Sequence, residues 1–353
     1  MLYQTENPHG GDLYSRPIHL DFSANTNPFG TPESVRRAVI ESAALLNQYP
    51  DPFCRKLVDA LADFEGVPKE YILCGCGAAE LIFSFCTAVK PKRALELAPT
   101  FSEYSSALEM VGCQVERFPL TRENGFALTE EFVETVQRDD HDVIFLCNPN
   151  NPTGRIIEPE LLERIVDCCH ERGIRLFLDE CFLDLSDQGR ELSLKYKLQS
   201  QPGLFILKAF TKSYGMAGLR LGYCLSSDGE LLKTMGCSVQ PWNVSLPAQK
   251  AGVAALKELE FLNRTRMEIQ TQRKWLEEQF AALGFYVCPA QANYLLLYHE
   301  LPMYDLLLER GILVRNCANY HGLEKGWFRV AVRREEENRI LIDAIQAVLG
   351  EER

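Results

Sequence analysis

The sequence predicts an α/β protein with an open, mainly parallel β-sheet that helices cover on both faces. Between residues 71 and 225, short apolar segments alternate with helical patterns, as expected for such a sheet. Polar clusters follow directly after several apolar segments, and open α/β sheets bind ligands at these strand ends. The chain has 353 residues, 46% of them hydrophobic, and is long enough for two domains.

Composition and charge exclude several classes of function. A net charge of -12 argues against a surface for nucleic acid or for anionic lipids. The first residues lack a basic stretch followed by an apolar one, and no apolar run approaches the roughly 18 residues of a membrane span, so a cytoplasmic protein is expected. The thirteen cysteines lack the paired spacing of a zinc site, so we expect reduced core thiols and no metal.

The predicted elements begin with a polar, turn-rich segment over residues 1–30 and helices over 32–46 and 54–64. A short strand at 71–73 leads through a Gly- and Ala-rich turn into a helix that ends near residue 89. Further strands are predicted over 93–97, 114–118, 143–147, 175–178, 204–207 and 221–225, and the intervening helices over 101–111, 129–137 and 159–172.

From residue 247 the pattern changes to a long helix that reaches about residue 283, with a break expected near Arg264. A strand at 293–297, a helix at 303–310, strands at 312–315 and 327–332 and a helix at 336–349 follow. We therefore predict an N-terminal arm that joins a small domain (1–40), a large ligand-binding domain (41–246) and a small C-terminal domain (247–353).

Two cations flank a small-residue loop within residues 205–223. Lys212 follows an apolar run, and Arg220 lies eight residues later in Gly-Leu-Arg-Leu-Gly. Desolvation lowers the pKa of a lysine in such a place, and a neutral amine is the form that attacks an aldehyde. The stretch is typical of a Schiff-base lysine with an arginine placed for an anion, although a surface lysine beside a turn explains this segment alone equally well.

Other segments favour pyridoxal phosphate as the cofactor. Asp179 ends an apolar run, where a buried carboxylate needs a cation such as the protonated ring nitrogen of this cofactor; a lone Asp is more often a turn cap. Asn151, in an Asn-Pro-Thr-Gly turn, can donate to the phenolic oxygen of the ring. The backbone of Ala78 and Ala79, at a helix start, can receive phosphate together with Arg220.

Two side chains complete the predicted cofactor site. Phe101, after Pro99-Thr100, is placed to stack on the ring, although an aromatic residue there is more often ordinary core. Lys212 is the predicted proton-transfer group as well as the attachment point, which makes Lys212 and Asp179 the predicted catalytic residues.

These motifs resemble the fold-type-I pyridoxal-phosphate enzymes of the aspartate-aminotransferase superfamily over nearly the whole chain. The resemblance rests on NPNNPTG at 148–154, Asp179 and TKSYGMAGLRLGY at 211–223, in this order and at these separations. It implies a large helix-covered sheet domain, a smaller α+β domain and a homodimer with active sites at the subunit interface. It also implies that Tyr49 reaches the neighbouring subunit's cofactor phosphate and that Arg329 holds the substrate's α-carboxylate.

Two branches of this superfamily compete, the histidinol-phosphate aminotransferases and the threonine-phosphate decarboxylases of cobalamin side-chain synthesis. His9-Gly10-Gly11 at the start is typical of the decarboxylases, and Phe182 stands where the aminotransferases usually have Tyr. Further matches to the decarboxylases are DFSANTNPFG at 21–30, GAAEL at 77–81, PTFSEY at 99–104, PWNV at 241–244, ILVRNCANYHGL at 312–323 and FRVAVR at 328–333. The resemblance therefore favours decarboxylation of L-threonine O-3-phosphate, with histidinol-phosphate transamination as the alternative.

Departures from the branch pattern include Asp12, Cys181 and Asn316, and they leave open whether the substrate is threonine phosphate or serine phosphate. Ala209 replaces a hydroxyl residue that usually binds the cofactor phosphate, a role that Thr211 can fill. Which bond breaks at the substrate's Cα depends on how its carboxylate is held. The predicted substrate-binding residues are His9, Gly10, Asn151, Arg315, Arg329 and Arg333. A further hypothesis is a binding protein without catalytic activity. The complete set of cofactor residues argues against this hypothesis.

Overall fold

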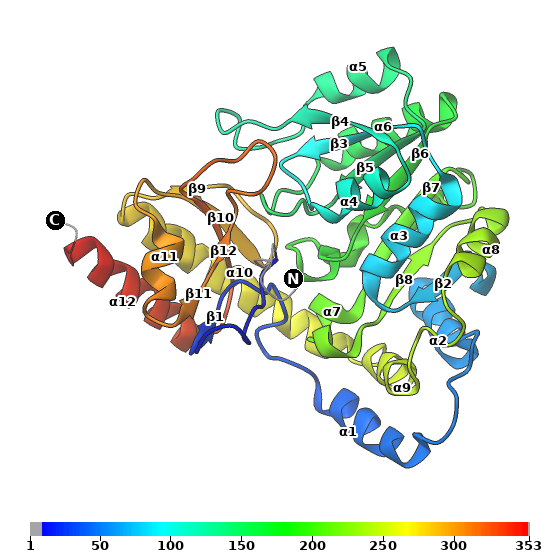
Figure 1. Cartoon of the computed structure of the whole chain (residues 1–353), viewed down its shortest axis with the longest axis horizontal. Coiled ribbons are helices and arrows are strands. Elements are labelled where there is room, and N and C mark those ends of the chain that lie inside the picture. Colours follow the sequence, from blue (N-terminus) through cyan, green and yellow to red (C-terminus); the bar gives the residue numbers. More distant parts are fainter. Residues whose placement is uncertain (1–8, 352–353) are drawn as a thin grey trace.

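The computed structural model describes residues 9–351 and contains a seven-stranded sheet with the strand order β2-β8-β7-β6-β5-β3-β4 (Figure 1). Its strands are β2 (Ile72–Gly75), β3 (Arg93–Ala98), β4 (Gln114–Pro119), β5 (Val143–Cys147), β6 (Arg175–Asp179), β7 (Leu204–Ala209) and β8 (Gly222–Leu225). Only β8 runs antiparallel to its neighbours. The predicted open and mainly parallel sheet is therefore confirmed.

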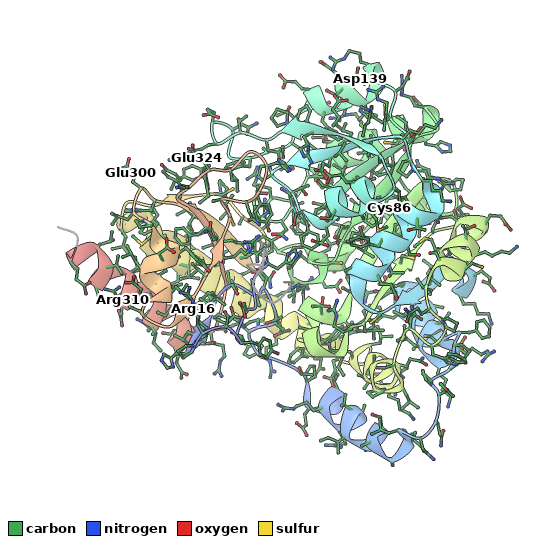
Figure 2. All side chains as sticks on the ribbon, in the orientation of Figure 1. Arg16, Cys86, Asp139, Glu300, Arg310 and Glu324 are labelled. Atoms are coloured by element: carbon green, nitrogen blue, oxygen red, sulfur yellow. The ribbon has the colours of Figure 1, made fainter. Side chains whose placement is uncertain are left out.

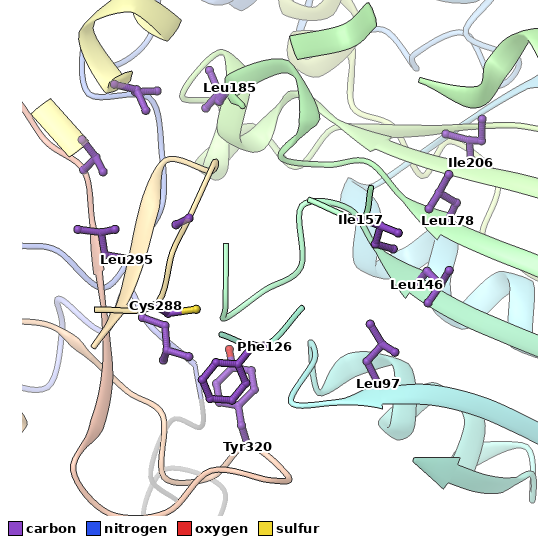
Figure 3. Close-up of a cluster of buried hydrophobic side chains, with 14 of the residues drawn as sticks. Leu97, Phe126, Leu146, Ile157, Leu178, Leu185, Ile206, Cys288, Leu295 and Tyr320 are labelled. Carbon is purple, nitrogen blue, oxygen red and sulfur yellow. The ribbon is translucent and has the colours of Figure 1, made fainter. Parts of the chain in front are cut away.

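Helices cover both faces of this sheet. The helices of this part of the chain are α1 (Glu33–Ser42), α2 (Arg55–Glu65), α3 (Gly77–Val89), α4 (Glu103–Met110), α5 (Glu130–Arg138), α6 (Pro159–Glu171), α7 (Phe210–Ser213), α8 (Gly229–Ser238) and α9 (Leu246–Ala255), against which α1 packs. Side chains alternate along each strand, so successive residues of β5, β6 and β7 face opposite helical layers. Phe145, Phe177 and Phe205 stack on the α3 and α4 side, with ring centroids 4.4 and 4.8 Å apart. Leu146, Leu178 and Ile206 lie on the opposite side (Figure 3).

A second, four-stranded sheet follows the order β12-β13-β10-β9, and a two-stranded pair joins β1 to β11. These strands are β1 (Leu20–Asp21), β9 (Tyr286–Val287), β10 (Tyr294–Tyr298), β11 (Ile312–Leu313), β12 (Arg315–Asn316) and β13 (Trp327–Ala331). The helices α10 (Leu259–Ala282), α11 (Met303–Leu308) and α12 (Glu335–Glu351) pack beside them. The domain boundaries after residues 40 and 246 stay predictions, and residues 1–8 of the predicted arm lie outside the described residues.

The predicted helix break near Arg264 is wrong. The chain leaves the helix at residues 256–258, between α9 and α10, and Arg264 lies inside the continuous helix α10. The N–H groups of Lys257 and Glu258 bond the carbonyls of Ala254 and Ala255, which tightens the last turn of α9. Because neither Gly nor Pro marks this turn, sequence pattern alone did not place it. Helix α8 was also absent from the predicted elements.

The cysteines are free thiols throughout the described range, and eleven of the thirteen are buried. Cys86 lies inside the molecule among the helices over the large sheet, whereas charged side chains such as Asp139 and Glu300 lie at its edge (Figure 2). Within residues 9–351, no helix is long and apolar enough to span a membrane.

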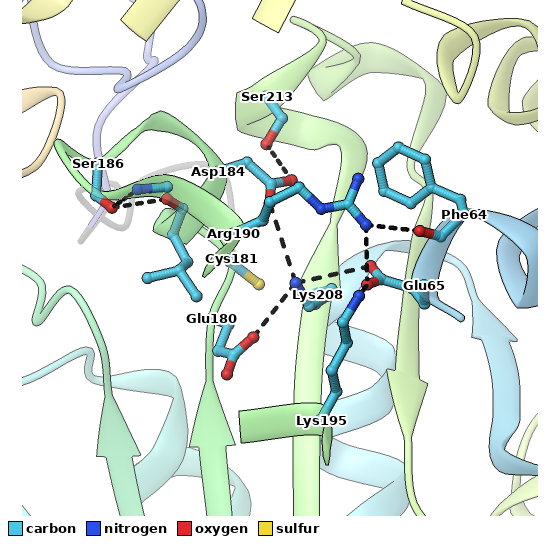
Figure 4. Close-up of polar contacts among 12 residues, drawn as sticks. Phe64, Glu65, Glu180, Cys181, Asp184, Ser186, Arg190, Lys195, Lys208 and Ser213 are labelled. Carbon is cyan, nitrogen blue, oxygen red and sulfur yellow. Dashed lines mark hydrogen bonds and ion pairs between the residues drawn. The ribbon is translucent and has the colours of Figure 1, made fainter. Parts of the chain in front are cut away.

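A buried ionic cluster lies at the end of β7 (Figure 4). Lys208 is 3% exposed, and its Nζ lies 3.3 Å from Glu180 Oε2, 3.6 Å from Glu65 Oε1 and 4.0 Å from Asp184 Oδ1. The other oxygen of Asp184 accepts a hydrogen bond from Ser213 Oγ at 3.3 Å. The cluster therefore links helix α2, the end of β6 and the turn that follows β7.

Candidate active site

A pocket of about 250 Å³ opens at the carboxyl ends of β5, β6 and β7, where the fold class places ligands. Residues from distant parts of the chain line it because these strand ends lie next to one another in the sheet. Twelve of the residues predicted from sequence are in its wall: His9, Gly10, Ala78, Ala79, Phe101, Asn151, Asp179, Thr211, Lys212, Arg220, Arg315 and Arg329.

Lys212 lies in the short helix α7, directly after β7, with its side chain in the pocket. Desolvation and the nearby positive charges of Arg329 and Arg220 lower the pKa of its amine to about 8. The ring of Phe182 lies beside it, with its centroid 5.6 Å from Nζ. More of the Lys212 amine is therefore neutral close to physiological pH than for an ordinary lysine, and the neutral amine is the form that a nucleophile or general base requires.

Asp179 is the last residue of β6 and is 5% exposed. Its Oδ2 accepts a hydrogen bond from Tyr104 at 2.6 Å, and its Oδ1 accepts one from the backbone N–H of Cys181 at 2.8 Å. Burial raises its pKa, although these two hydrogen bonds act in the opposite direction. Within the described part of the chain this carboxylate forms no direct ion pair, and Lys212 is a nearby positive charge that acts on it from a longer distance.

The start of helix α3 and Arg220 form an anion-binding cradle. The first N–H groups of a helix have no partner inside it, and here those of Ala78 and Ala79 face the pocket with Arg220. A Cβ on Gly77 would lie 2.5 Å from Arg220 Nη2, and one on Gly222 would lie 2.7 Å from the backbone N of Ala78. Arg220 itself has a φ of 56°, a strained value for a residue with a side chain.

Asn151 and Arg329 meet on the opposite wall. Asn151 follows β5, and Arg329 comes from the centre of β13, so the large and the four-stranded sheets each supply one residue. Arg329 is 6% exposed and donates to Asn151 Oδ1 and, at 2.8 Å, to the carbonyl of Ser23. The Asn25 amide lies beside the same guanidinium. This wall thus presents a buried, oriented cation to the pocket.

His9 and Arg315 lie at the mouth of the pocket. His9 Nε2 lies 3.1 Å from Glu103 Oε1, and its ring centroid lies 6.4 Å from that of Phe101. Arg315 donates to Asn319 Oδ1 at 2.9 Å, and its guanidinium lies 5.1 Å from the centre of the Tyr320 ring. Gly10 packs so closely on Ser23 that a Cβ would lie 2.6 Å from the Ser23 carbonyl oxygen.

Two predicted site residues lie outside this pocket. Tyr49 is 80% exposed and stacks on Trp242 at a centroid distance of 4.8 Å. Arg333 directs its guanidinium to backbone carbonyls, with Nη2 2.6 Å from the oxygen of Asp21 and 3.2 Å from that of Ala24. In this structure Arg333 therefore holds the segment that forms the pocket floor.

Sequence reasoning missed two residues that line the pocket, Ser23 and Tyr320, and one residue behind its wall, Tyr104. Tyr104 is the hydroxyl partner of Asp179, Ser23 supplies a carbonyl to Arg329, and Tyr320 lies 3.5 Å from Asn151 Oδ1 through its hydroxyl. Tyr104 and Tyr320 occur in the segments at 99–104 and 312–323 that match the threonine-phosphate decarboxylases. This match was the only indication in the sequence that they belong to the site. Their roles depend on long-range contacts that spacing does not reveal.

Fold and pocket together are those of a fold-type-I pyridoxal-phosphate enzyme. Residues 17–345 match the family aminotransferase class I and II, and the chain belongs to this family. It is 39% identical over 341 residues to a threonine-phosphate decarboxylase of Salmonella typhimurium, covering 94% of this chain and 91% of the relative. A histidinol-phosphate aminotransferase of Caldanaerobacter subterraneus subsp. tengcongensis is 32% identical over 340 residues, covering 95% and 94%.

A crystal structure of a histidinol-phosphate aminotransferase from Clostridium acetobutylicum superposes with a TM-score of 0.87 at 27% identity, covering 94% of this chain and 99% of that one. Enzymes of this family depend on pyridoxal 5'-phosphate, which is the cofactor of this chain. The pocket fits this cofactor on three counts: a buried carboxylate without a direct ion pair among the described residues, a cradle that only glycines leave open, and a lysine with a lowered pKa.

Proposed function

We propose that this chain decarboxylates an O-phospho-amino acid, converting L-threonine O-3-phosphate to 1-amino-2-propanol phosphate and CO₂. The observation that carries the proposal is the 39% identity over 94% of the chain to a threonine-phosphate decarboxylase, against 32% for the aminotransferase of similar coverage. The reaction would place the chain in cobalamin side-chain synthesis.

The cofactor would be held by residues at one edge of the large sheet, where its parallel strands end. When bound, pyridoxal phosphate supplies an electron sink for the electron pair that remains at Cα as CO₂ leaves. Arg220 and the N–H groups of Ala78 and Ala79 would hold its phosphate, with Thr211 beside them. Asp179 would pair with the ring nitrogen, Asn151 would donate to the phenolic oxygen, and Phe101 would stack on the ring.

Arg329 is the proposed anchor of the substrate carboxylate. A guanidinium binds a carboxylate through two parallel hydrogen bonds, and burial strengthens this pairing. Its contacts to Asn151 and Ser23 hold the group in one orientation, which determines the Cα bond that is placed to break. Decarboxylation requires that the bond placed to break is the one between Cα and the carboxylate, and not the bond between Cα and hydrogen.

Lys212 would then return a proton to Cα. An acid–base group works best when its pKa lies near the working pH, and the Lys212 pKa of about 8 meets this condition. The ring of Phe182 faces the amine without a hydroxyl to compete for the proton. His9, the backbone of Gly10 and Arg315, at the pocket mouth, are the proposed contacts of the substrate phosphate.

Purified holoenzyme incubated with L-threonine O-3-phosphate tests the proposal. We expect CO₂ and 1-amino-2-propanol phosphate in equal amounts, and neither product from Lys212→Ala. Release of an oxo acid instead, with the amine form of the cofactor, would reject decarboxylation. Serine phosphate assayed in parallel ranks the two candidate substrates.

The second candidate function is transamination of histidinol phosphate. The structural likeness to the Clostridium acetobutylicum enzyme and the 32% identity to an aminotransferase favour it. We would assign transamination as the function if histidinol phosphate with 2-oxoglutarate is turned over faster than CO₂ is released from threonine phosphate.

We also infer that the enzyme acts as a homodimer. Large apolar side chains are exposed along residues 40–53 and at Trp242, which is unusual for a monomer surface. Tyr49 lies in this surface and outside its own pocket, as expected for a residue that reaches the active site of a second copy.

A further inference from the structure

A second cavity, of about 160 Å³, lies beside the active site and shares only Tyr320 with it. One wall comes from the end of β3 and the start of α4, and the other from residues 319–321, which follow β12. Leu97 and Tyr320, which line it, lie on facing segments (Figure 3). The cavity therefore lies where the large sheet meets the C-terminal part of the chain.

A buried carboxylate lines this cavity, and one of its oxygens has no hydrogen-bond partner among the described residues. Glu96 is 2% exposed, and its Oε1 accepts hydrogen bonds from Ser105 Oγ and, at 3.0 Å, from Arg117 Nε. Its Oε2 accepts no hydrogen bond from any residue between 9 and 351. A carboxylate oxygen buried in this way is costly unless a cation or a donor compensates it.

The remaining polar side chains of the wall are five hydroxyl groups, the Asn319 amide and the His321 imidazole. Thr100 Oγ1 donates to Asn150 Oδ1 at 2.8 Å, and Ser106 Oγ donates to the Ser102 carbonyl at 3.1 Å, so both hydroxyl oxygens keep their lone pairs. The hydroxyl-bearing residues of the wall are Thr100, Ser102, Ser105, Ser106 and Tyr320.

The charged side chains at the cavity are Glu96, Glu109 and the Arg117 that pairs with them, and the His321 imidazole also lines it. Glu109 also lines it, and Arg117, which is paired with Glu96, lies 3.7 Å from Glu109 Oε1. Two carboxylates thus share one guanidinium, which disfavours an anion such as phosphate. Hard cations prefer oxygen ligands, and one unused carboxylate oxygen among neutral hydroxyls matches a single positive charge.

We propose that this cavity binds a small monovalent cation (Na⁺, K⁺ or NH₄⁺), with Glu96 Oε2 as the charged ligand and wall hydroxyls as the neutral ligands. The bound ion joins the β3–α4 segment to residues 319–321. Because Tyr320 also lines the active site and reaches Asn151, the ion fixes one wall of that site.

The test compares cations at constant ionic strength. Holoenzyme is dialysed into tetramethylammonium chloride, whose methyl groups prevent coordination by oxygens, and this salt is replaced stepwise by NaCl, KCl or NH₄Cl. We expect at least one of the three to raise Tm saturably by about 2–4 °C, because a ligand that binds only the folded state stabilises it.

Glu96→Gln, which keeps the shape and the hydrogen bonds of the side chain, should abolish this rise. Glu131→Gln, an exposed change on α5, should retain it. Equal Tm values in all four salts, or the same rise in Glu96→Gln as in the parent, would overturn the proposal. If Glu96→Gln does not fold, the double variant Ser102→Ala/Ser106→Ala should need a several-fold higher salt concentration for half of the rise, and an unchanged midpoint would also overturn the proposal.

Thallium-205 NMR gives a direct readout that does not depend on activity. Tl⁺ should show saturable binding to the parent, displaced by the cation that raises Tm most. In Glu96→Gln this binding should be absent, and Tl⁺ binding of equal strength in that variant would contradict the assignment of Glu96.

Discussion

Lys212 illustrates how the surroundings of one side chain set its chemistry. Two cations, Arg329 and Arg220, act in the same direction as desolvation, and the charge of Asp179 lies close by. The same arginines are the proposed anion-binding groups, so the residues that hold substrate and cofactor also keep the amine partly neutral.

Capture of the cofactor by the apoenzyme should depend on the protonation of Lys212. Its pKa is lowered from 10.5 to about 8, so the reactive neutral form rises with pH and levels off above about 8. The rate of capture, followed by absorbance, should therefore rise about tenfold per unit between pH 6 and 7. Arg329→Gln removes a neighbouring charge and should move the midpoint upward. A midpoint that stays near 10 in the parent would contradict this account.

Asp179 and Tyr104 should differ in how strongly they affect turnover. Asp179→Asn removes the buried charge, and we expect kcat to fall by roughly 10²- to 10³-fold. Tyr104→Phe removes only the hydrogen bond to Oδ2, whose loss should cost about tenfold in kcat because bonds to charged groups contribute about 1.5–3 kcal/mol. Equal losses in the two variants would argue that Tyr104 has a role beyond holding Asp179.

At the scale of elements, strand β7 and helix α7, which follows it, each carry one lysine, and the two lysines have opposite environments. Lys212, just past its end, lies among cations, whereas carboxylates surround Lys208 within the strand and raise its pKa. The cluster around Lys208 also reaches the turn that carries Lys212 through Asp184 and Ser213. Ion pairs and hydrogen bonds therefore link strand β7, helix α2 and the segment of Lys212 and Ser213, in addition to their packing.

Removing one member of this cluster should destabilise the fold. Burial alone would raise the pKa of Glu65, but the charges of Lys208 and Lys195 outweigh burial and lower it to about 2. Its contribution is therefore complete above its unfolded-state pKa of 4.5 and is lost as the pH falls towards 2. Glu65→Gln should lower the free energy of unfolding by about 3 kcal/mol at pH 7.

Urea unfolding of Glu65→Gln and the parent between pH 3 and 7 measures this effect. The difference between them should shrink as the pH falls below 4.5, because the unfolded parent then binds a proton that folded Glu65 binds only near pH 2. Glu70→Gln, an exposed change in the short 3-10 turn after helix α2, serves as the control and should unfold like the parent. A difference that stays constant down to pH 3 would mean that the loss comes from packing and not from the charge.

At the scale of the whole molecule, the exposed apolar surface along residues 40–53 predicts a dimer. Trp242→Glu places a charge beside Tyr49 and should convert the dimer to a monomer at micromolar concentration, measured by sedimentation. Met110→Glu, which alters an exposed apolar side chain on α4, should leave the dimer intact. A parent that sediments as a monomer would reject the inferred assembly.

Tyr49 provides a second test of the same assembly. If it reaches the cofactor phosphate of a second copy, Tyr49→Phe should weaken cofactor binding about tenfold, because a hydrogen bond to a charged group is lost. The dimer itself should persist, since the ring still stacks on Trp242. Unchanged cofactor affinity in a dimeric Tyr49→Phe variant would show that the Tyr49 hydroxyl does not bind the cofactor phosphate.

The sequence by itself determined the sheet, most of its helices and twelve pocket residues, because alternating apolar segments and the residues after each strand are local signals. Tertiary structure alone placed Tyr104 on Asp179, turned Arg333 to the backbone of Asp21, ended α9 before residue 256 and buried Glu96 Oε2 without a hydrogen-bond partner. These features depend on contacts between segments far apart in the chain, and the energy of such contacts leaves no periodic pattern in the residues that make them.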